Sequence, residues 1–374
     1  MVRSTRRDFA AAAAAFTVLK PQTALGFPAN SALSVGLIGA GRRGVAVSGI
    51  FAAHEFARIG ALCDIYDDQL QAAAQKFSGA RLYRNLNELL ASDVDAVLIA
   101  TPPYLHPEHF EAAVKARKHI FLEKPAAVDA AGCRRVIEAA RRADPTKRIS
   151  VGYQQRYGKD YRRAFELVKS GELGAIKMVR AAWLGGGLPR RSGHAASEEQ
   201  VRNWLFYREK SGDILVEQNC HNLDVVNWFA GTHPIKACGY GGRAVRTDIG
   251  NIMDNLAVTF QFAGGLNFSY SANQFSTGGF SDVSETFVCE RGAITTSRRG
   301  YKLYRSPDRN APPEEVATDY DITRDAVDLF IAGARSGQIE NAAFPAAEST
   351  LTAIMAREAI YAGREMTWEQ ISRS

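Results

Sequence analysis

The sequence predicts an α/β fold with a doubly wound parallel sheet in its first half, on three observations. Short apolar runs alternate with amphipathic helical patterns from Ser34 to Tyr153. A glycine-rich turn follows the first apolar run, and an acidic residue follows the second. Such alternation places parallel strands side by side, with helices on both faces of the sheet.

Each apolar run has the length of a buried strand, and each interval between runs has room for a helix. The expected strands are S-V-G-L-I-G (34–39), F-A-R-I-G-A-L-C (56–63), V-D-A-V-L-I-A-T (94–101), H-I-F-L-E (119–123) and R-I-S-V-G-Y (148–153), with a short run at 81–83. We expect a first domain over 33–152 and a second over 153–374.

The turn G-A-G-R-R-G predicts a Rossmann dinucleotide site, because it follows a strand and opens a helix. Gly39 permits the tight turn, Gly41 lets the backbone approach a pyrophosphate, and Gly44 lets the helix pack close to the strand. Asp64 ends the second strand, where a carboxylate binds the adenosine ribose and repels a 2′-phosphate. NAD(H) is therefore favoured over NADP(H).

Two arginines and two later segments complete the expected cofactor site. Arg42 and Arg43 lie inside the glycine turn, where either could reach a 2′-phosphate. T-P-P-Y-L-H (101–106) and E-K-P (123–125) both follow strands, at the edge of the sheet where ligands bind. From these segments the expected cofactor-binding residues are Thr101, Pro102, His106, Glu123 and Lys124.

The E-K-P segment, together with G-D-I-L-V-E-Q-N-C-H-N-L-D (212–224), resembles the Gfo/Idh/MocA family of sugar and cyclitol oxidoreductases. The resemblance extends to the C-terminal segment E-S-T-L-T-A-I-M-A-R-E-A-I-Y-A-G-R. It implies a Rossmann domain followed by an α+β domain with a large open, mostly antiparallel sheet, and a homodimer or homotetramer. Strand-like runs at 176–183, 255–262, 266–273 and 285–290 agree with such a sheet.

Oxidation of a secondary alcohol needs a hydride acceptor, a base and a group that polarises the oxygen. We assign the base to His221 and the polarising cation to Lys124, a pairing that is similar to the family's. In a helix over 213–229, Glu217 would lie one turn before His221 and would orient and activate its ring. The family commonly has Asp where this chain has Glu217, and Gly where it has Asn219.

Four more residues are candidate substrate contacts, and a metal is not expected. Tyr153, Arg156 and Trp204 could line a site for a polyhydroxylated substrate, although ordinary packing explains them equally well. Asp224 would lie beside His221 on the same helix. A Glu217/His221 pair could also ligate a metal, but no third ligand accompanies it.

The N-terminal segment S-T-R-R-D-F is followed by an alanine-rich run and Lys20, which predicts a twin-arginine export signal over 1–32. The alternative is a basic N-terminus before a cytosolic domain. Export predicts a periplasmic protein that engages the twin-arginine machinery without stable membrane insertion. Because free NAD(H) is scarce there, we expect a tightly bound cofactor that travels with the folded enzyme.

Composition narrows the remaining classes of function. The net charge of +6 includes a surplus of three from residues 1–32, and the other arginines are scattered, so nucleic-acid binding is not expected. The five cysteines have no regular spacing and predict isolated buried or half-buried thiols. Two alternatives to net oxidation stay open: a redox-neutral glycosidase or lyase that oxidises its substrate transiently, and a silent sugar-binding module, which Lys124 and His221 disfavour.

Overall fold

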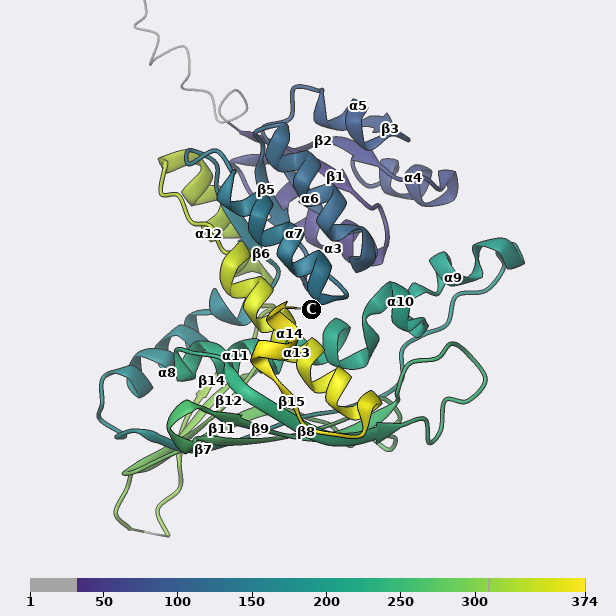
Figure 1. Cartoon of the computed structure of the whole chain (residues 1–374). Helices are drawn as coiled ribbons and strands as arrows, with labels where there is room; N and C mark the ends of the chain where they lie inside the picture. Colours follow the sequence, from purple (N-terminus) through teal and green to yellow (C-terminus); the bar gives the residue numbers. More distant parts are fainter. Residues whose placement is uncertain (1–31, 309, 374) are drawn as a thin grey trace, which may run out of the picture.

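Two sheets with helices between them form the framework of the protein (Figure 1). The structure, a computed structural model, describes residues 32–308 and 310–373, so residues 1–31 of the expected export signal lie outside the described part. In the described residues, no helix combines the length and the apolar character that crossing a bilayer requires.

The first sheet has six parallel strands in the order β3-β2-β1-β4-β5-β6, with helices on both faces. Every strand expected in this half is present, with its ends shifted by at most two residues. The elements are β1 (Leu33–Ile38), α3 (Arg42–Ala52), β2 (Ala57–Cys63), α4 (Asp67–Ala74), β3 (Arg81–Tyr83), α5 (Leu86–Leu90), β4 (Ala96–Ile99), α6 (His106–Lys115), β5 (His119–Leu122), α7 (Ala130–Arg141) and β6 (Ile149–Val151). The predicted Rossmann fold class is confirmed.

The second sheet has nine strands in the order β14-β13-β12-β11-β7-β10-β9-β8-β15, antiparallel except for the β7–β10 pair. The sequence reading missed β8 and β12 to β15. The elements are α8 (Lys159–Lys169), β7 (Ile176–Leu184), α9 (Glu199–Arg202), α10 (Arg208–Ser211), a π-helix (Leu215–Asn219), α11 (Cys220–Ala230), β8 (Pro234–Gly242), β9 (Asn255–Phe262), β10 (Asn267–Asn273), β11 (Asp282–Cys289), β12 (Gly292–Ser297), β13 (Gly300–Tyr304), β14 (Glu314–Ala317) and β15 (Met366–Thr367). The expected mostly antiparallel sheet is confirmed.

The C-terminal helices α12 (Thr323–Ser336), α13 (Ala343–Ala362) and α14 (Trp368–Arg373) complete the core. Phe330 of α12 packs edge to face on Phe51 and Phe121 of the Rossmann domain, at ring distances of 5.8 and 5.6 Å. Helix α13 contacts α7 on one side and β8 and α11 on the other (Figure 1). The C-terminal chain therefore packs against both domains. Four cysteines are buried as free thiols, but Cys238 is exposed, unlike the buried or half-buried thiol expected there.

Candidate active site

A cavity of about 1100 Å³ lies where the strand ends of the first sheet face the second sheet. Gly41 and Asp64 line the end where the adenosine is expected, called the adenosine end below. Lys124, Trp183 and His221 line the opposite end, which holds the expected catalytic residues and is called the catalytic end. The size and the mixed apolar and polar lining suit a ligand larger than a single sugar.

The glycine turn has the shape that a diphosphate needs. Gly39 has a φ of +94°, and a Cβ there would lie 2.7 Å from the Thr101 amide nitrogen. A Cβ on Gly44 would lie 2.1 Å from the Gly39 carbonyl oxygen, so helix α3 could not pack this close to the turn. Gly41 opens to the cavity and gives the amino end of α3 no side-chain cap. These features fit a dinucleotide phosphate.

Asp64 lies at the end of β2, and its carboxylate braces the glycine turn. One oxygen accepts from the Ala40 amide at 2.8 Å, and the other accepts from the Tyr66 amide at 2.9 Å. Burial raises the pKa of Asp64, and the two backbone amides oppose that rise. Asp64 lines the cavity, so the same carboxylate can meet a ribose.

The two arginines of the turn differ in position. Arg42 is exposed and lines the cavity. Arg43 also lines it, but its Nε donates to Glu123 at 2.8 Å. Glu123 is buried and stands at the carboxyl end of β5, so Arg43 is held toward the catalytic end, away from the ribose position considered for it.

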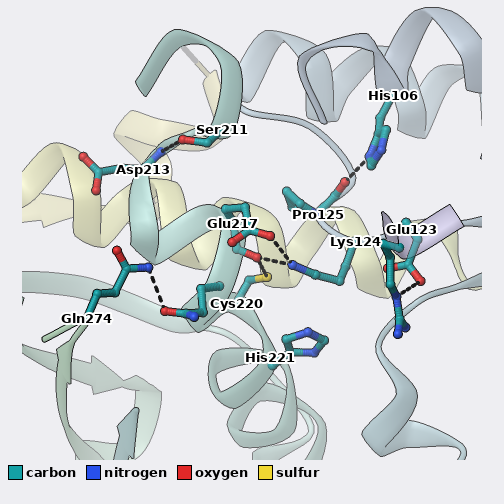
Figure 2. Close-up of polar contacts among 12 residues, drawn as sticks. His106, Glu123, Lys124, Pro125, Ser211, Asp213, Glu217, Cys220, His221 and Gln274 are labelled. Atoms are coloured by element: carbon teal, nitrogen blue, oxygen red, sulfur yellow. Dashed lines mark hydrogen bonds and ion pairs between the residues drawn. The ribbon is translucent and has the colours of Figure 1, made fainter. Parts of the chain in front are cut away.

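Thr101 and Pro102 line the cavity, whereas His106 is buried behind it. The His106 ring contacts the Pro125 carbonyl oxygen at 2.7 Å (Figure 2). It also contacts the Thr101 carbonyl oxygen at 2.8 Å, which ties the two loops together. Burial lowers the pKa of His106 to about 4, so the neutral ring donates to only one of these oxygens. His109, which sequence reasoning missed, lines the cavity and bonds Thr101.

Lys124 forms a partly buried ion pair with Glu217. Its Nζ lies 2.7 Å from Oε1 and also donates to the Glu217 carbonyl (Figure 2). Burial opposes the charge of Lys124, but Glu217 outweighs it, so the pKa of Lys124 is raised. Lys124 is therefore an ammonium ion with a fixed position.

His221 follows the π-helix on α11, and its Nδ1 lies 3.1 Å from Oε1 of Gln155. The amide oxygen can only accept, so Nδ1 carries the hydrogen and Nε2 is the basic nitrogen. The expected contact of Glu217 with His221 gives way to the Glu217–Lys124 pair, because the Lys124 ammonium is a stronger partner for a carboxylate than a neutral imidazole. Burial and the cations Arg298, Lys124 and Arg43 hold the pKa of His221 well below its usual range, opposite to the expected rise.

The structure separates the four candidate substrate contacts. Trp204 lines the cavity, whereas Tyr153, Arg156 and Asp224 are not part of its wall. Arg156 donates to both oxygens of fully buried Asp224 at 2.8 to 3.0 Å. The Tyr153 hydroxyl lies 3.2 Å from Oγ1 of Thr350 on α13. These three residues join α11 and α13 to the end of the Rossmann sheet.

Sequence reasoning missed several residues at the catalytic end. Trp183 of β7 lies against His221, with 6.0 Å between ring centroids and a 21° interplanar angle. Gln154 lines the cavity, and its buried Oε1 has no hydrogen-bond partner in the described chain. Arg298 lines the same region from the β12–β13 turn. A signal for Arg298 was present, since S-R-R-G joins two alternating runs as a hairpin turn would.

The bridging segment, residues 185–212, connects the second domain to the adenosine end of the cavity. Arg202 donates to both oxygens of Asp68 at 2.7 and 2.9 Å, and its Cζ lies 3.7 Å from the Tyr66 ring centroid. Arg191 donates to Gln69 at 3.1 Å. Helices α9 and α10 of this segment lie below α4 in Figure 1. The bridging segment therefore joins the two domains across the cleft.

Comparison with known families agrees with this geometry. The model "Oxidoreductase family, NAD-binding Rossmann fold" (GFO_IDH_MocA) matches residues 33–153. The model "GFO/IDH/MocA C-terminal domain" matches residues 161–295. Together the two models match well over half of the chain.

Curated relatives include inositol dehydrogenases. The chain is 26% identical to myo-inositol 2-dehydrogenase of Thermotoga maritima over 62% of this chain and 66% of that protein. It is 31% identical to inositol 2-dehydrogenase of Salmonella typhimurium over 45% of this chain and 46% of that protein. The chain thus spans from about half to two thirds of the length of these relatives.

Solved structures share the fold at low identity. A levoglucosan dehydrogenase in complex with NADH has a TM-score of 0.77 and 19% identity, over 91% of this chain and all of the other. The scyllo-inositol dehydrogenase of Lactobacillus casei has a TM-score of 0.73 and 17% identity, over 91% and 99%. At this identity the likeness establishes the fold alone.

Proposed function

Because the chain belongs to the GFO/IDH/MocA family, we propose that it is an NAD(H)-dependent oxidoreductase acting on a CH–OH group of a sugar, cyclitol or glycoside. One observation carries this proposal: Lys124, Glu217 and His221 lie in the same cavity as the glycine turn. The names of the curated inositol dehydrogenases support the substrate class.

The protein's own groups manage the proton and the oxygen. When bound, NAD⁺ supplies the hydride acceptor. His221 is neutral, and its Nε2 accepts the proton of the substrate hydroxyl, while Gln155 holds the ring through Nδ1. The Lys124 ammonium, held by Glu217, donates to the same oxygen and stabilises the negative charge that develops there. In the reverse direction His221 returns the proton.

Two substitutions test these roles. Lys124→Ala and His221→Ala should each lower turnover by about 10² or more, while the dinucleotide stays bound. Lys177→Ala is the matched control, because Lys177 is an exposed lysine of β7 paired with Glu290, and its turnover should not change. Wild-type turnover in both active-site variants would refute the assignment.

The bridging segment supports tight retention of the cofactor. Its bonds from Arg202 to Asp68 and from Arg191 to Gln69 must break before the cleft can open on that side. Heat denaturation of the purified protein should release stoichiometric NAD(H), identified by mass spectrometry. Arg202→Ala should copurify with less dinucleotide. Purified wild-type protein without dinucleotide would contradict retention.

Export rests on the sequence, since Arg6 and Arg7 lie outside the described residues. A twin-arginine route carries a folded protein with its cofactor, which supplies NAD(H) to a periplasmic enzyme. The double substitution Arg6→Lys/Arg7→Lys should leave the protein in the cytoplasm, as measured by cell fractionation. Unchanged periplasmic yield would exclude this route.

Cofactor retention also favours a second candidate, a redox-neutral glycosidase or lyase. A cofactor that cannot exchange must be reoxidised in the same site. Transient oxidation to a ketone would acidify the adjacent C–H, and loss of that proton would let the leaving group depart by elimination. In a glycosidase, water would then add to the resulting double bond, and the hydride would return to the ketone. Aglycone release without an electron acceptor identifies this reaction. Dependence on an acceptor identifies net oxidation.

The open face of the nine-stranded sheet is the proposed surface for a homodimer or homotetramer. Its outward positions include Thr259, Ser269 and Ser271, which are small, exposed and suited to close packing between sheets. Multi-angle light scattering gives the assembly state. A mass of one chain at micromolar concentration would exclude the oligomer.

A further inference from the structure

Arg298 is a cation in the catalytic end of the cavity, and it has no paired carboxylate among the residues that the structure describes. It lies in the turn between Ser297 and Gly300, and its Cζ is 5.1 Å from the ring centroid of Trp183. Its Nε is buried without a hydrogen-bond partner, and its guanidinium makes no ion pair with residues 32–308 or 310–373. A buried charge in this state is costly unless a ligand pairs with it.

The neighbouring cations already have carboxylate partners. Lys124 is paired with Glu217, and Arg43 is paired with Glu123. Their charges are therefore balanced within the protein, and Arg298 supplies the excess positive charge at this end of the cavity.

Two other carboxyl groups act on Arg298 from a distance, and neither replaces a ligand. Glu285 accepts hydrogen bonds from Asn222, Tyr161 and Thr296, which occupy both of its oxygens. Asp321 is exposed and caps the Thr323 amide at 2.9 Å. Burial lowers the pKa of Arg298 despite both acids. An anion in the cavity would relieve this cost.

We propose that Arg298 binds the carboxylate of an acidic sugar, so that the substrate is a uronic acid or a uronic-acid glycoside. The inference rests on the proposed function and narrows its substrate class. One guanidinium matches one carboxylate in charge and in fork geometry. The Trp183 ring lines the cavity beside His221 and Arg298 and would give the sugar an apolar contact. His221 and Arg298 lie within 6.0 Å of that ring, so one pyranose can reach both.

Gln154 adds a second polar contact for the same substrate. Its unpartnered Oε1 can accept from a sugar hydroxyl. The competing assignment gives Arg298 to the cofactor diphosphate. Position disfavours this assignment. The expected diphosphate site at Gly41 is served by Arg42 and the amino end of α3, whereas Arg298 lies beside Trp183 in the second sheet.

The test compares binding of matched sugars to the full-length, dinucleotide-loaded protein. Isothermal titration uses methyl glucuronoside against methyl glucoside, and galacturonate against galactose. We expect each acid to bind about ten- to a hundred-fold more tightly than its neutral partner. Arg298→Gln should abolish this difference, and Arg298→Lys should restore part of it.

Arg299→Gln is the matched control, because it removes the same charge from the same turn at an exposed residue outside the cavity wall. It should keep the preference for acids, and thermal unfolding verifies that all three variants fold. Equal affinity for acid and neutral sugars in the wild type would overturn the inference, as would tighter binding of glucose 6-phosphate than of glucuronate. Loss of bound dinucleotide in Arg298→Gln with an unchanged acid preference would assign Arg298 to the cofactor.

Turnover is measured separately with the same sugars. Acid-selective binding without reduction of bound NAD⁺ would leave this inference standing and reject the proposed function. Reduction of bound NAD⁺ by neutral sugars, with no preference for acids, would support the proposed function and reject this inference.

Discussion

Replacing Asp224 with Asn separates a structural role from a substrate contact. Asp224 is fully buried on α11, three residues after His221. Arg156 donates to both of its oxygens, and the Ser349 hydroxyl donates to Oδ1 at 2.7 Å. Asn keeps the shape of Asp but removes the charge, so it leaves the guanidinium without its counter-ion.

The expected loss follows from that geometry. Removing one partner of a buried, hydrogen-bonded ion pair costs about 3–5 kcal/mol. The total stability of a protein is commonly only about 5–15 kcal/mol, so this loss is easily measured by urea unfolding. Ser349→Ala removes one hydrogen bond to the same carboxylate and should cost about 1 kcal/mol. The double variant Arg156→Met/Asp224→Leu should recover a large part of the loss, because no unpaired charge stays buried.

Kinetics complete the test. At a temperature where Asp224→Asn is folded, its KM should equal that of the wild type, because Asp224 is not part of the cavity wall. An unchanged free energy of unfolding together with a raised KM would refute the structural role and return Asp224 to the substrate site.

Three further predictions concern charged groups. Glu217→Gln should lower the pKa of Lys124, because the Glu217 charge no longer offsets the effect of burial. The basic limb of the kcat/KM profile should then move to lower pH, with at least a tenfold loss of rate. A basic limb at the wild-type pH would contradict the Lys124–Glu217 pairing. Asp64→Ala should reduce the amount of copurified NAD(H), because the glycine turn loses the carboxylate that braces it and the ribose loses its hydrogen-bond acceptor. In thermal-shift titrations the difference in affinity between NADH and NADPH should become smaller. An unchanged preference for NADH would assign cofactor selection to another residue. Burial raises the pKa of Glu285 to about 7, so the protonated carboxyl stabilises the fold at low pH and this stabilisation is lost between pH 4.5 and 7. Over this range the free energy of unfolding of the wild type should fall by about 3 kcal/mol relative to that of Glu285→Gln. Parallel curves of unfolding free energy against pH for the two proteins would refute the raised pKa.

The first sheet was predictable because local patterns determine it. Apolar strands and amphipathic helices alternate along the chain, and Gly39, Gly44 and Asp64 act within one βαβ unit. Lys124 was predictable for the same reason, since the carboxyl end of a parallel strand faces the ligand cleft.

The catalytic contacts were harder to predict because they depend on distant segments. The expected Glu217–His221 contact was inferred from spacing within one helix, but the Glu217 carboxylate pairs with Lys124, which lies 93 residues earlier in the chain. The partner of His221 is Gln155, which lies 66 residues earlier in the chain. No spacing rule in a single sequence connects these two residues.

Arg298 and Trp183 illustrate a further limit. Both belong to the second sheet, where β7 and β12 are separated by more than a hundred residues of chain. In the sheet order only β11 lies between β12 and β7, so the turn after β12 comes close to Trp183 on β7. A hairpin pattern could locate the Arg298 turn, but only the strand order brings it beside Trp183.

Arg298 also links substrate binding to the basicity of His221. After burial, the Arg298 charge is the largest influence that lowers the pKa of His221. A carboxylate bound to Arg298 would offset that charge, so the pKa of His221 should be higher in the substrate complex than in the free enzyme. Since kcat reports the complex and kcat/KM the free enzyme, the acid limb of kcat should lie at higher pH for uronates. With neutral sugars the acid limbs of kcat and kcat/KM should lie closer together. Coincident acid limbs for uronates would show that a ligand on Arg298 does not change the pKa of His221.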